Sequence, residues 1–232
     1  NVRTEKGPIK IYGRVRLAKV GEAHGEEPIW SDWLCYGNWG NDILRGSLKT
    51  EKEGIGVKLS VDTIEVEKEG WVGDRFQFQL QSEGWLLPSD ISHVAVTLYP
   101  EEKQHLQWGE EERGGLLHHV LDVPRYSQMR RDPNTAGVMC SATCVSMVLN
   151  YYGFAVLPEE AAWGLKDFDY GPENSGFGNW SFNAAYLGSQ GFEASVKSMT
   201  LKELKEEIQA GRPTPVSVAY SNKPEDGLPY VA

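Results

Sequence analysis

The sequence predicts an α+β protein whose first part is an antiparallel, β-sandwich-like domain. Two observations carry this prediction. Apolar and polar residues alternate in several short runs before residue 100, and signals that start and stop helices follow from residue 140 onward. A period of two is typical of strands with one buried face. Helices that precede a strand, rather than alternating with strands, favour a layered α+β order in the second part.

Four short runs in the first hundred residues alternate between apolar and polar side chains. They span residues 9–17, 55–61, 76–80 and 94–98. Glycine or proline, which favours turns, stands between the runs. Several short strands at this spacing are typical of a sandwich or a jelly-roll-like pair of sheets.

A charged stretch that ends in two glycines separates the two parts of the chain. Five glutamates lie between residues 101 and 112, and Gly114 and Gly115 follow them. Charge runs and glycine pairs are typical of linkers. We therefore expect a β-rich accessory domain over residues 1–115 and a second domain over residues 116–232.

In the second domain, residues that begin or end helices bound four segments. Asparagine and threonine are preferred N-caps, proline fits the first turn, and glycine ends helices in a left-handed conformation. The helices so predicted are residues 140–152, a short helix from Pro158, residues 179–190 and residues 200–211. A strand over residues 216–220 is expected after Pro213 and Pro215.

The charge balance bears on the partners of the protein. The 232 residues include 23 basic and 33 acidic side chains, a net charge of −10. Nucleic acids and anionic membranes attract positive surfaces, so neither is expected as a partner. No run approaches the roughly 20 apolar residues of a membrane span. The polar N-terminus shows no signal peptide and no initiator Met, so we expect a processed or trimmed chain, cytoplasmic or secreted.

The sequence contains three cysteines, Cys35, Cys140 and Cys144. Cys140 and Cys144 are one helical turn apart, where Cβ atoms lie about 5–6 Å from each other, whereas a disulfide needs about 3.5–4.5 Å. We therefore expect free thiols. No zinc-type spacing of cysteine and histidine occurs, and no metal or organic cofactor is implied.

Cys140 stands at the expected N-terminus of a helix, after a loop that contains Gly137. The helix dipole and the unpaired N–H groups at such an end favour a thiolate. A thiolate there can attack a carbonyl carbon, and the first-turn N–H groups can receive the oxyanion. The alternative is a small side chain in a helical core, where cysteine is more often found. That structural role is the one predicted for Cys144.

Three segments around Cys140 add a pattern to this chemistry. Val-Pro-Arg-Tyr-Ser-Gln stands at residues 123–128, Gly-Val-Met-Cys-Ser-Ala-Thr at residues 137–143 and Met-Val-Leu-Asn-Tyr-Tyr-Gly at residues 147–153. In order and spacing they resemble the papain-like bacterial cysteine peptidases of the bacteriocin-leader (double-glycine) "C39-like" family, over residues 121–220. The resemblance implies a papain-like cysteine peptidase domain in residues 116–232 and a hydrolase that acts on a peptide or protein substrate.

The resemblance also implies roles for four residues. Cys140 would be the catalytic nucleophile, and Gln128, twelve residues earlier, would donate a hydrogen bond to the oxyanion. Asn179 and Trp180 would lie beside the substrate cleft; the alternative for these two is an N-cap and a core aromatic residue. The family has a Gly-Pro-Thr-type turn after its cysteine, whereas Ser-Ala-Thr stands here and retains small residues.

The catalytic histidine of the family lies downstream of the cysteine. All five histidines of this chain precede Cys140, at positions 24, 93, 105, 118 and 119. We therefore expect that the sequence stops before the histidine, which leaves the papain-like domain incomplete at its C-terminus. The alternatives are a catalytically inactive papain-like or β-sandwich binding protein, and a Cys-dependent amidase or transglutaminase-like acyl transferase. A base at His118 or His119 is a further alternative, since triad geometry recurs in different chain orders.

Four aromatic residues gather in the first domain: Trp30, Trp33, Tyr36 and Trp39. We interpret them as part of a sheet core, the more frequent role of such a cluster. The alternative is an exposed face through which the N-terminal domain contacts a glycan or a protein.

Overall fold

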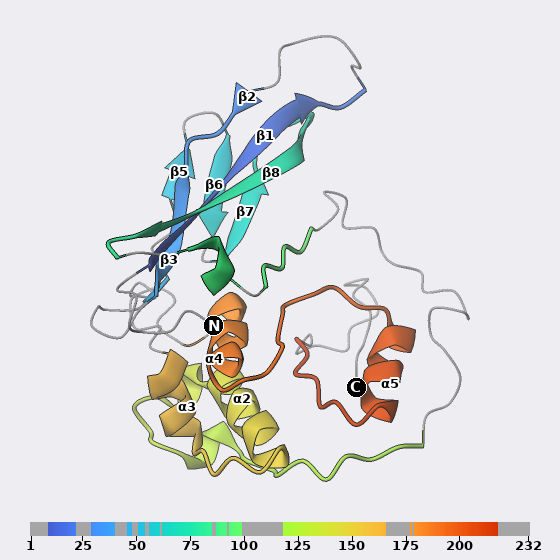
Figure 1. Cartoon of the computed structure of the whole chain (residues 1–232). Helices are drawn as coiled ribbons and strands as arrows, with labels where there is room; N and C mark the ends of the chain where they lie inside the picture. The colour runs from blue at the N-terminus through green and yellow to red at the C-terminus, as the bar shows by residue number, and fades with distance from the viewer. Residues whose placement is uncertain are drawn as a thin grey trace.

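The structure is a computed structural model that describes residues 9–21, 29–39, 46–47, 51–53, 56–60, 62–84, 87–91, 93–98, 118–165, 177 and 179–217. Antiparallel sheets occupy the first part of the described chain and helices the second part (Figure 1). The prediction of an α+β protein is confirmed at this level. No helix within these ranges is both long enough and apolar enough to cross a membrane.

The strands are β1 (Ile9–Lys19), β2 (Ile29–Trp30), β3 (Leu34–Trp39), β4 (Gly46–Ser47), β5 (Glu51–Glu53), β6 (Val57–Ser60), β7 (Thr63–Val66) and β8 (Trp71–Ser82). The α-helices are α2 (Cys140–Tyr151), α3 (Pro158–Leu165), α4 (Trp180–Ser189) and α5 (Leu201–Gln209). Short 3-10 helices are η2 (Pro88–Asp90), η3 (Gln128–Arg130) and η4 (Ala136–Val138).

Strand β1 is the centre of the larger sheet. It pairs with β2, β3 and β8, all antiparallel, and β3 also pairs with β4. Strands β5, β6 and β7 form a second antiparallel sheet. The strands predicted at residues 9–17, 55–61 and 76–80 are thus found as β1, β6 and β8.

Side chains from both sheets share one buried cluster. The alternation predicted from the sequence appears as burial in β6, where Val57 and Leu59 are buried and Lys58 and Ser60 are partly exposed. Burying a side chain of this kind contributes about 1.5–3 kcal/mol. The cluster consists of Val15, Leu17, Leu34, Val57, Leu59 and Trp71.

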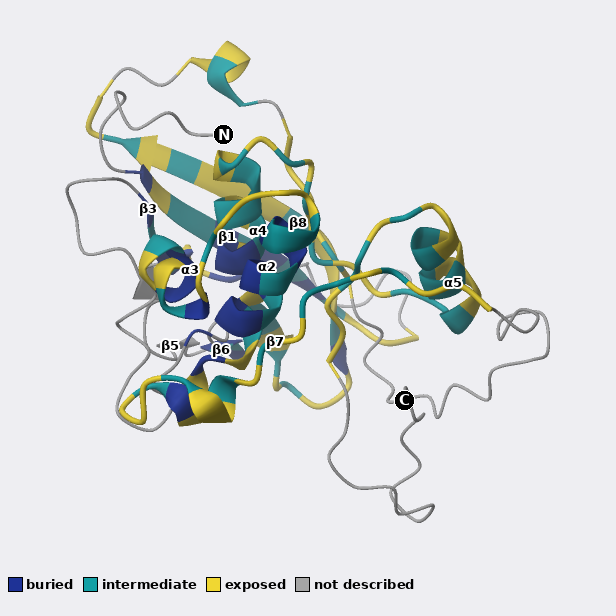
Figure 2. Cartoon of the chain, turned by 90° about the horizontal axis from the view of Figure 1, so that it is seen from below, coloured by how far each residue is buried: buried dark blue, intermediate teal, exposed yellow. Residues whose placement is uncertain are grey.

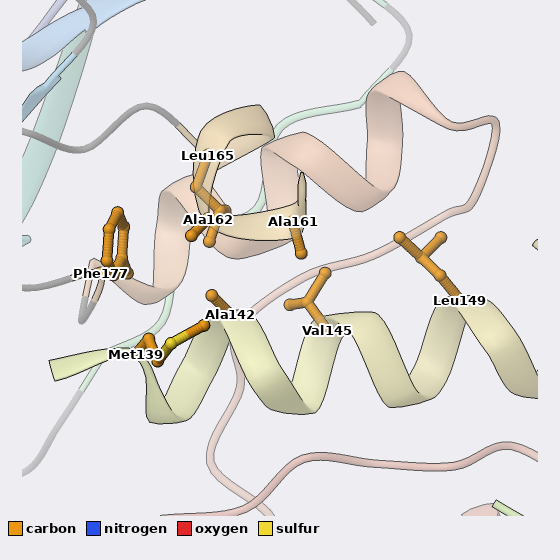
Figure 3. Close-up of a cluster of buried hydrophobic side chains, with 8 residues drawn as sticks. All are labelled: Met139, Ala142, Val145, Leu149, Ala161, Ala162, Leu165 and Phe177. Atoms are coloured by element: carbon orange, nitrogen blue, oxygen red, sulfur yellow. The ribbon is translucent and has the colours of Figure 1, made fainter. Parts of the chain in front are cut away.

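A second buried cluster joins α2 to α3. Ala142, Val145 and Leu149 share one face of α2, at the three- and four-residue spacing of a helix. Figure 3 shows these side chains pointing toward α3. The cluster consists of Met139, Ala142, Val145, Leu149, Ala161, Ala162, Leu165 and Phe177.

The residues predicted to end α2 and to begin α5 have these roles in the structure. Gly153 adopts a φ of 87° just after α2, and the N–H of Phe154 donates to Leu149 O at 3.0 Å. At α5, Thr200 Oγ1 accepts from Glu203 N at 3.2 Å, and Thr200 N donates to Glu203 Oε2 at 2.7 Å. Such local hydrogen bonds depend on neighbouring residues alone, and for that reason the helix ends could be predicted.

One predicted strand is wrong. Residues 93–98 have no regular secondary structure, and Val94, Val96 and Leu98 are 46%, 50% and 77% exposed. Alternation produces a strand only where a neighbouring strand takes up the backbone N–H and C=O groups, and in the described part of the chain this segment pairs with none. Of the strand predicted at residues 216–220, Val216 and Ser217 are irregular and residues 218–220 lie outside the described ranges, as does the predicted linker.

Helix α5 lies apart from the other helices (Figures 1 and 2). Its apolar face was predicted from Leu201, Leu204 and Ile208, and each of these is only partly buried. The helix contains no fully buried residue. The functional geometry therefore depends on α2, α3 and α4.

Gly13 of β1 is expected not to tolerate a single added methyl group. A Cβ atom there would lie 2.5 Å from Tyr36 Cε2 and 3.1 Å from atoms of Ile64 and Phe76. Overpacking costs about 1–3 kcal/mol, against about 0.4–1 kcal/mol gained from a less flexible unfolded chain. Gly13→Ala should therefore lower the free energy of unfolding, measured by urea denaturation.

Gly73→Ala in β8 is the matched control. Its Cβ would meet Val15 and Val66 at an ordinary contact distance of 3.8 Å, so its stability should equal or slightly exceed that of the wild type. A Gly13→Ala protein as stable as Gly73→Ala would contradict the packing of Tyr36 across β1.

Candidate active site

Cys140 is the first residue of α2 and lies on the surface of the protein. Met139, immediately before it, is 0% exposed. Thr143 donates its backbone N–H and its hydroxyl to Met139 O, at 2.9 and 2.8 Å. The buried Met139 side chain and these two hydrogen bonds fix the first turn, so that Cys140 is presented outward.

Among the residues that the structure describes, no side chain caps this end of α2. The N-cap residue is Met139, and no side-chain cap hydrogen bond is present. This position usually carries Ser, Thr, Asp or Asn, whose oxygen accepts from first-turn N–H groups, and replacing such a cap costs about 0.5–2 kcal/mol. The uncapped end leaves those N–H groups to solvent or to an anionic ligand. A thiolate or an oxyanion needs such an end.

The other two cysteines lie deeper in the protein. Cys35 is buried and Cys144 is partly buried, and none of the three cysteines forms a disulfide, which agrees with the reduced state predicted for Cys140 and Cys144. Burial raises the pKa of the Cys144 thiol, and the neighbouring Cys140 adds to this shift. Among the residues placed by the structure, no group of three or more His, Cys, Asp or Glu could hold a metal ion.

The loop before α2 is held by its own hydrogen bonds. Gln128 opens η3, and the N–H of Arg131 donates back to Gln128 O at 3.0 Å. Asp132 then forms a tight turn, in which Oδ1 accepts from Asn134 N at 3.0 Å and the carbonyl accepts from Ala136 N at 2.8 Å. The loop folds back so that η3 contacts η4, which directly precedes α2. The role of the Gln128 side chain stays a prediction.

A bidentate ion pair ties this loop to α3. Arg131 Nε and Nη2 donate to Glu159 Oε1 and Oε2 at 2.8 and 2.5 Å. Glu159 stands in the first turn of α3, where a carboxylate also interacts favourably with the helix dipole. The hydrogen bond from Arg131 lowers the pKa of the Glu159 carboxyl below its ordinary value of 4.5.

The segment before Gln128 lies along the second half of α2. Tyr126 N–H approaches Met147 Sδ at 3.4 Å, and the Tyr126 hydroxyl donates to Asn150 Oδ1 at 3.5 Å. Asn150 is ten residues beyond Cys140, about 15 Å along the helix axis. The chain from His118 and His119 therefore reaches α2 near the end opposite Cys140.

These two histidines do not complete the site. Both are exposed, and in the part of the chain that the structure describes neither is hydrogen-bonded to Cys140. His93 is exposed in the irregular segment after η2, and the remaining two histidines lie outside the described ranges. The alternative of a base at His118 or His119 gains no support from this arrangement.

Asn179 and Trp180 stand at the start of α4. Asn179 is 1% exposed, and its Oδ1 accepts from Phe182 N at 2.9 Å, so its side chain serves as the N-cap. Trp180, one residue later, is 43% exposed. Of the two side chains predicted beside the cleft, only that of Trp180 has a large surface for contact with a ligand.

Phe177 joins the starts of α2 and α4. Its N–H donates to Val138 O at 3.2 Å, and its carbonyl accepts from Ser141 Oγ at 2.5 Å. Asn183 Nδ2 in α4 donates to the same carbonyl at 3.1 Å. One carbonyl therefore links the residue after Cys140 to α4. The sequence carries no local signal for the roles of Phe177 and Asn183, because their contacts join separate segments.

The aromatic residues of the first domain divide between core and surface. Trp39 is 8% exposed, and Tyr36 packs against the buried cluster of the sheets. Trp30 and Trp33 instead flank the Arg14 guanidinium, with ring centroids 4.7 and 4.4 Å from its Cζ. The core interpretation describes two of the four residues, and contact with a glycan or protein stays a prediction.

Comparison with known proteins agrees with the motifs around Cys140. Residues 120–227 match the model of the family described as Peptidase_C39 like family. The matched range contains Gln128, Cys140, Asn179 and Trp180, and the resemblance predicted from the sequence is confirmed. No curated protein and no solved structure matches the chain.

The Arg131–Glu159 pair makes a stability contribution with a defined pH dependence. The folded-state pKa of Glu159 is lowered, so the pair stabilises the protein above the ordinary value of 4.5, and this contribution is lost as the pH falls through the lower folded-state pKa. Glu159→Gln should therefore be less stable than the wild type near neutral pH, and the difference should shrink in acid, measured by urea denaturation across the pH range.

Glu193→Gln is the control for the loss of one exposed carboxylate. Its difference from the wild type should stay near zero at every pH. If the loss in free energy of unfolding caused by Glu159→Gln grew as the pH fell, this result would contradict the stabilising role of the pair.

Proposed function

We propose that the protein is a cysteine peptidase that hydrolyses a peptide bond through the Cys140 thiolate. The match of residues 120–227 to the model of the C39-like peptidase family supports this proposal. The family match supports a cysteine peptidase as a class; the reaction and the residue roles are the proposal. The observation that carries it is the exposed thiol at the uncapped start of α2.

In the proposed reaction, the Cys140 sulfur bonds to the carbonyl carbon of the substrate, and the carbonyl electron pair moves onto the oxygen. The backbone N–H of Cys140 and the side-chain amide of Gln128 donate hydrogen bonds to this oxyanion. When the intermediate collapses, the C–N bond breaks and the amine leaves with a proton from a general acid. Water then hydrolyses the thioester, which releases the carboxylic acid and restores the thiol.

The proton transfers need a base, and the family resemblance implies a histidine downstream of Cys140. The five histidines of the 232 residues all precede Cys140, so the proposal assigns the role of base to none of them. Removing one donor from an oxyanion site typically costs about 10²–10³ in kcat, which is the contribution expected of Gln128.

Two alternatives share this site. A catalytically inactive papain-like or β-sandwich protein would bind a peptide without cleaving it. A Cys-dependent amidase or transglutaminase-like acyl transferase would form the same thioester and would pass the acyl group to water or to an amine, respectively. Product analysis by mass spectrometry separates an inactive protein, a hydrolase and an acyl transferase, since they give intact peptide, acid or a new amide, and the position of the acid distinguishes a cleaved peptide bond from a cleaved side-chain amide.

We also propose that residues 1–115 form a sandwich-like accessory domain and that residues 116–232 belong to a papain-like domain. The two buried clusters support this layout, because they have no residue in common. One is built from strands, and the other from α2, α3 and Phe177. Separate cores are typical of separate domains.

Replacing Cys140 with alanine should abolish hydrolysis by the complete protein. The loss in kcat should be on the order of 10³-fold or more, the usual effect of removing a nucleophile. Initial rates on a peptide library, followed by mass spectrometry, provide the measurement. Cys144→Ala is the control and should retain activity, because Cys144 is partly buried within the same helix. A Cys140→Ala protein with wild-type activity would contradict the proposed function.

A further inference from the structure

The turn between β6 and β7 contacts the first residue of α4. Asp62 Oδ2 accepts a hydrogen bond from Trp180 N at 3.1 Å, although 118 residues separate the two in the sequence. The other carboxylate oxygen of Asp62 accepts from Thr63 Oγ1 at 3.2 Å. Both oxygens therefore have a partner, and the carboxylate is held in one orientation.

This hydrogen bond adds a second side-chain acceptor to the cap of α4. The first four N–H groups of a helix have no partner within the helix. Asn179 Oδ1 takes the N–H of Phe182, and Asp62 takes the N–H of Trp180. A carboxylate at this end also interacts favourably with the helix dipole. One cap therefore comes from the helix's own segment and the other from the sheets.

A second contact reinforces the first. The ring of Trp39, at the end of β3, lies edge-on against the ring of Phe182, with centroids 5.3 Å apart and planes at 77°. These side chains are 8% and 3% exposed, so the contact is buried. Aromatic pairs of this geometry are stabilising beyond the area they bury. In Figure 1, α4 lies on the side of the helices that faces the sheets.

The surroundings of Asp62 add rigidity on the side of the sheets. Asp62 lies near the phenol of Tyr36, whose pKa is raised by burial and further by the negative charge of Asp62. Tyr36 in turn packs against Gly13 of β1. The carboxylate therefore stands on a packed part of the sheets.

We propose that Asp62 is a positioning residue, which fixes the first turn of α4, and with it Trp180, from the β-rich part of the chain. The path continues through Asn183 and Phe177 to Ser141, the residue after Cys140. The part of the inference that concerns substrate rests on the proposed peptidase function. The part that concerns the helix does not.

The first readout is the backbone amide of Trp180, which does not depend on activity. In protein labelled with ¹⁵N-tryptophan, Asp62→Ala should exchange the Trp180 amide about tenfold faster than the wild type, because the acceptor is lost. Asp62→Asn keeps an acceptor oxygen at the same place and should restore most of the protection. A Trp180→Phe protein identifies the resonance.

Glu65→Ala is the matched control. Glu65 lies in the same hairpin, pairs with Lys58 at 3.5 Å, and its removal also deletes one carboxylate. Exchange at Trp180 should match the wild type in this variant. An unchanged amide in Asp62→Ala, or an equal acceleration in Glu65→Ala, would overturn the inference.

The second readout is the split between KM and kcat for peptide hydrolysis. Asp62→Ala should raise KM about threefold to tenfold with kcat retained. Trp180 loses its hydrogen bond to Asp62, whereas the first turn of α2 is also held by Thr143 and the buried Met139. A variant that is merely less folded would lose kcat at constant KM, and this result would overturn the positioning role. If the wild type hydrolyses no peptide, the proposed function fails, and the amide exchange alone decides whether Asp62 fixes α4.

Discussion

The structure of the site depends on two adjacent residues, one of which is buried while the next is exposed. Met139 is completely buried and Cys140, next to it, is exposed. Met139 belongs to the cluster that joins α2, α3 and Phe177, so the packing of three segments sets the rotation of α2. Local rules disfavour methionine as an N-cap. This uncapped helix end is stable because the packing of Met139 supports it, and its first-turn N–H groups are left for a ligand.

Contacts on two sides keep the exposed helix end in place. The turn at Asp132 and the ion pair of Arg131 with Glu159 hold the preceding loop against α3. The Phe177 carbonyl also accepts hydrogen bonds from Ser141 and from the Asn183 side chain of α4. Transition states are stabilised best by donors that are already oriented before substrate arrives. A helix end that is held in place by both sets of contacts satisfies that condition.

The parts of this arrangement that obey local rules could be predicted from the sequence. Gly153 and Thr200 interact only with residues close to them in the sequence, so the end of α2 and the start of α5 follow from the local sequence. Residues 94–98 show the limit of periodicity, because their alternation has the period of a strand but no partner strand is found among the described residues. The contact of Asp62 with Trp180 spans 118 residues and has no signature in either segment. Such contacts are decided by tertiary packing, which sequence patterns do not encode locally.

The most direct measurement of the central claim is to find which sulfur reacts with a peptide that carries a carbon electrophile at its cleavage position. The folded protein is treated with such a peptidyl ketone, digested, and mapped by tandem mass spectrometry. The account predicts an adduct on Cys140 and none on Cys35 or Cys144, with this selectivity lost after denaturation. Modification of Cys35 or Cys144 in the folded protein, with Cys140 unmodified, would contradict it.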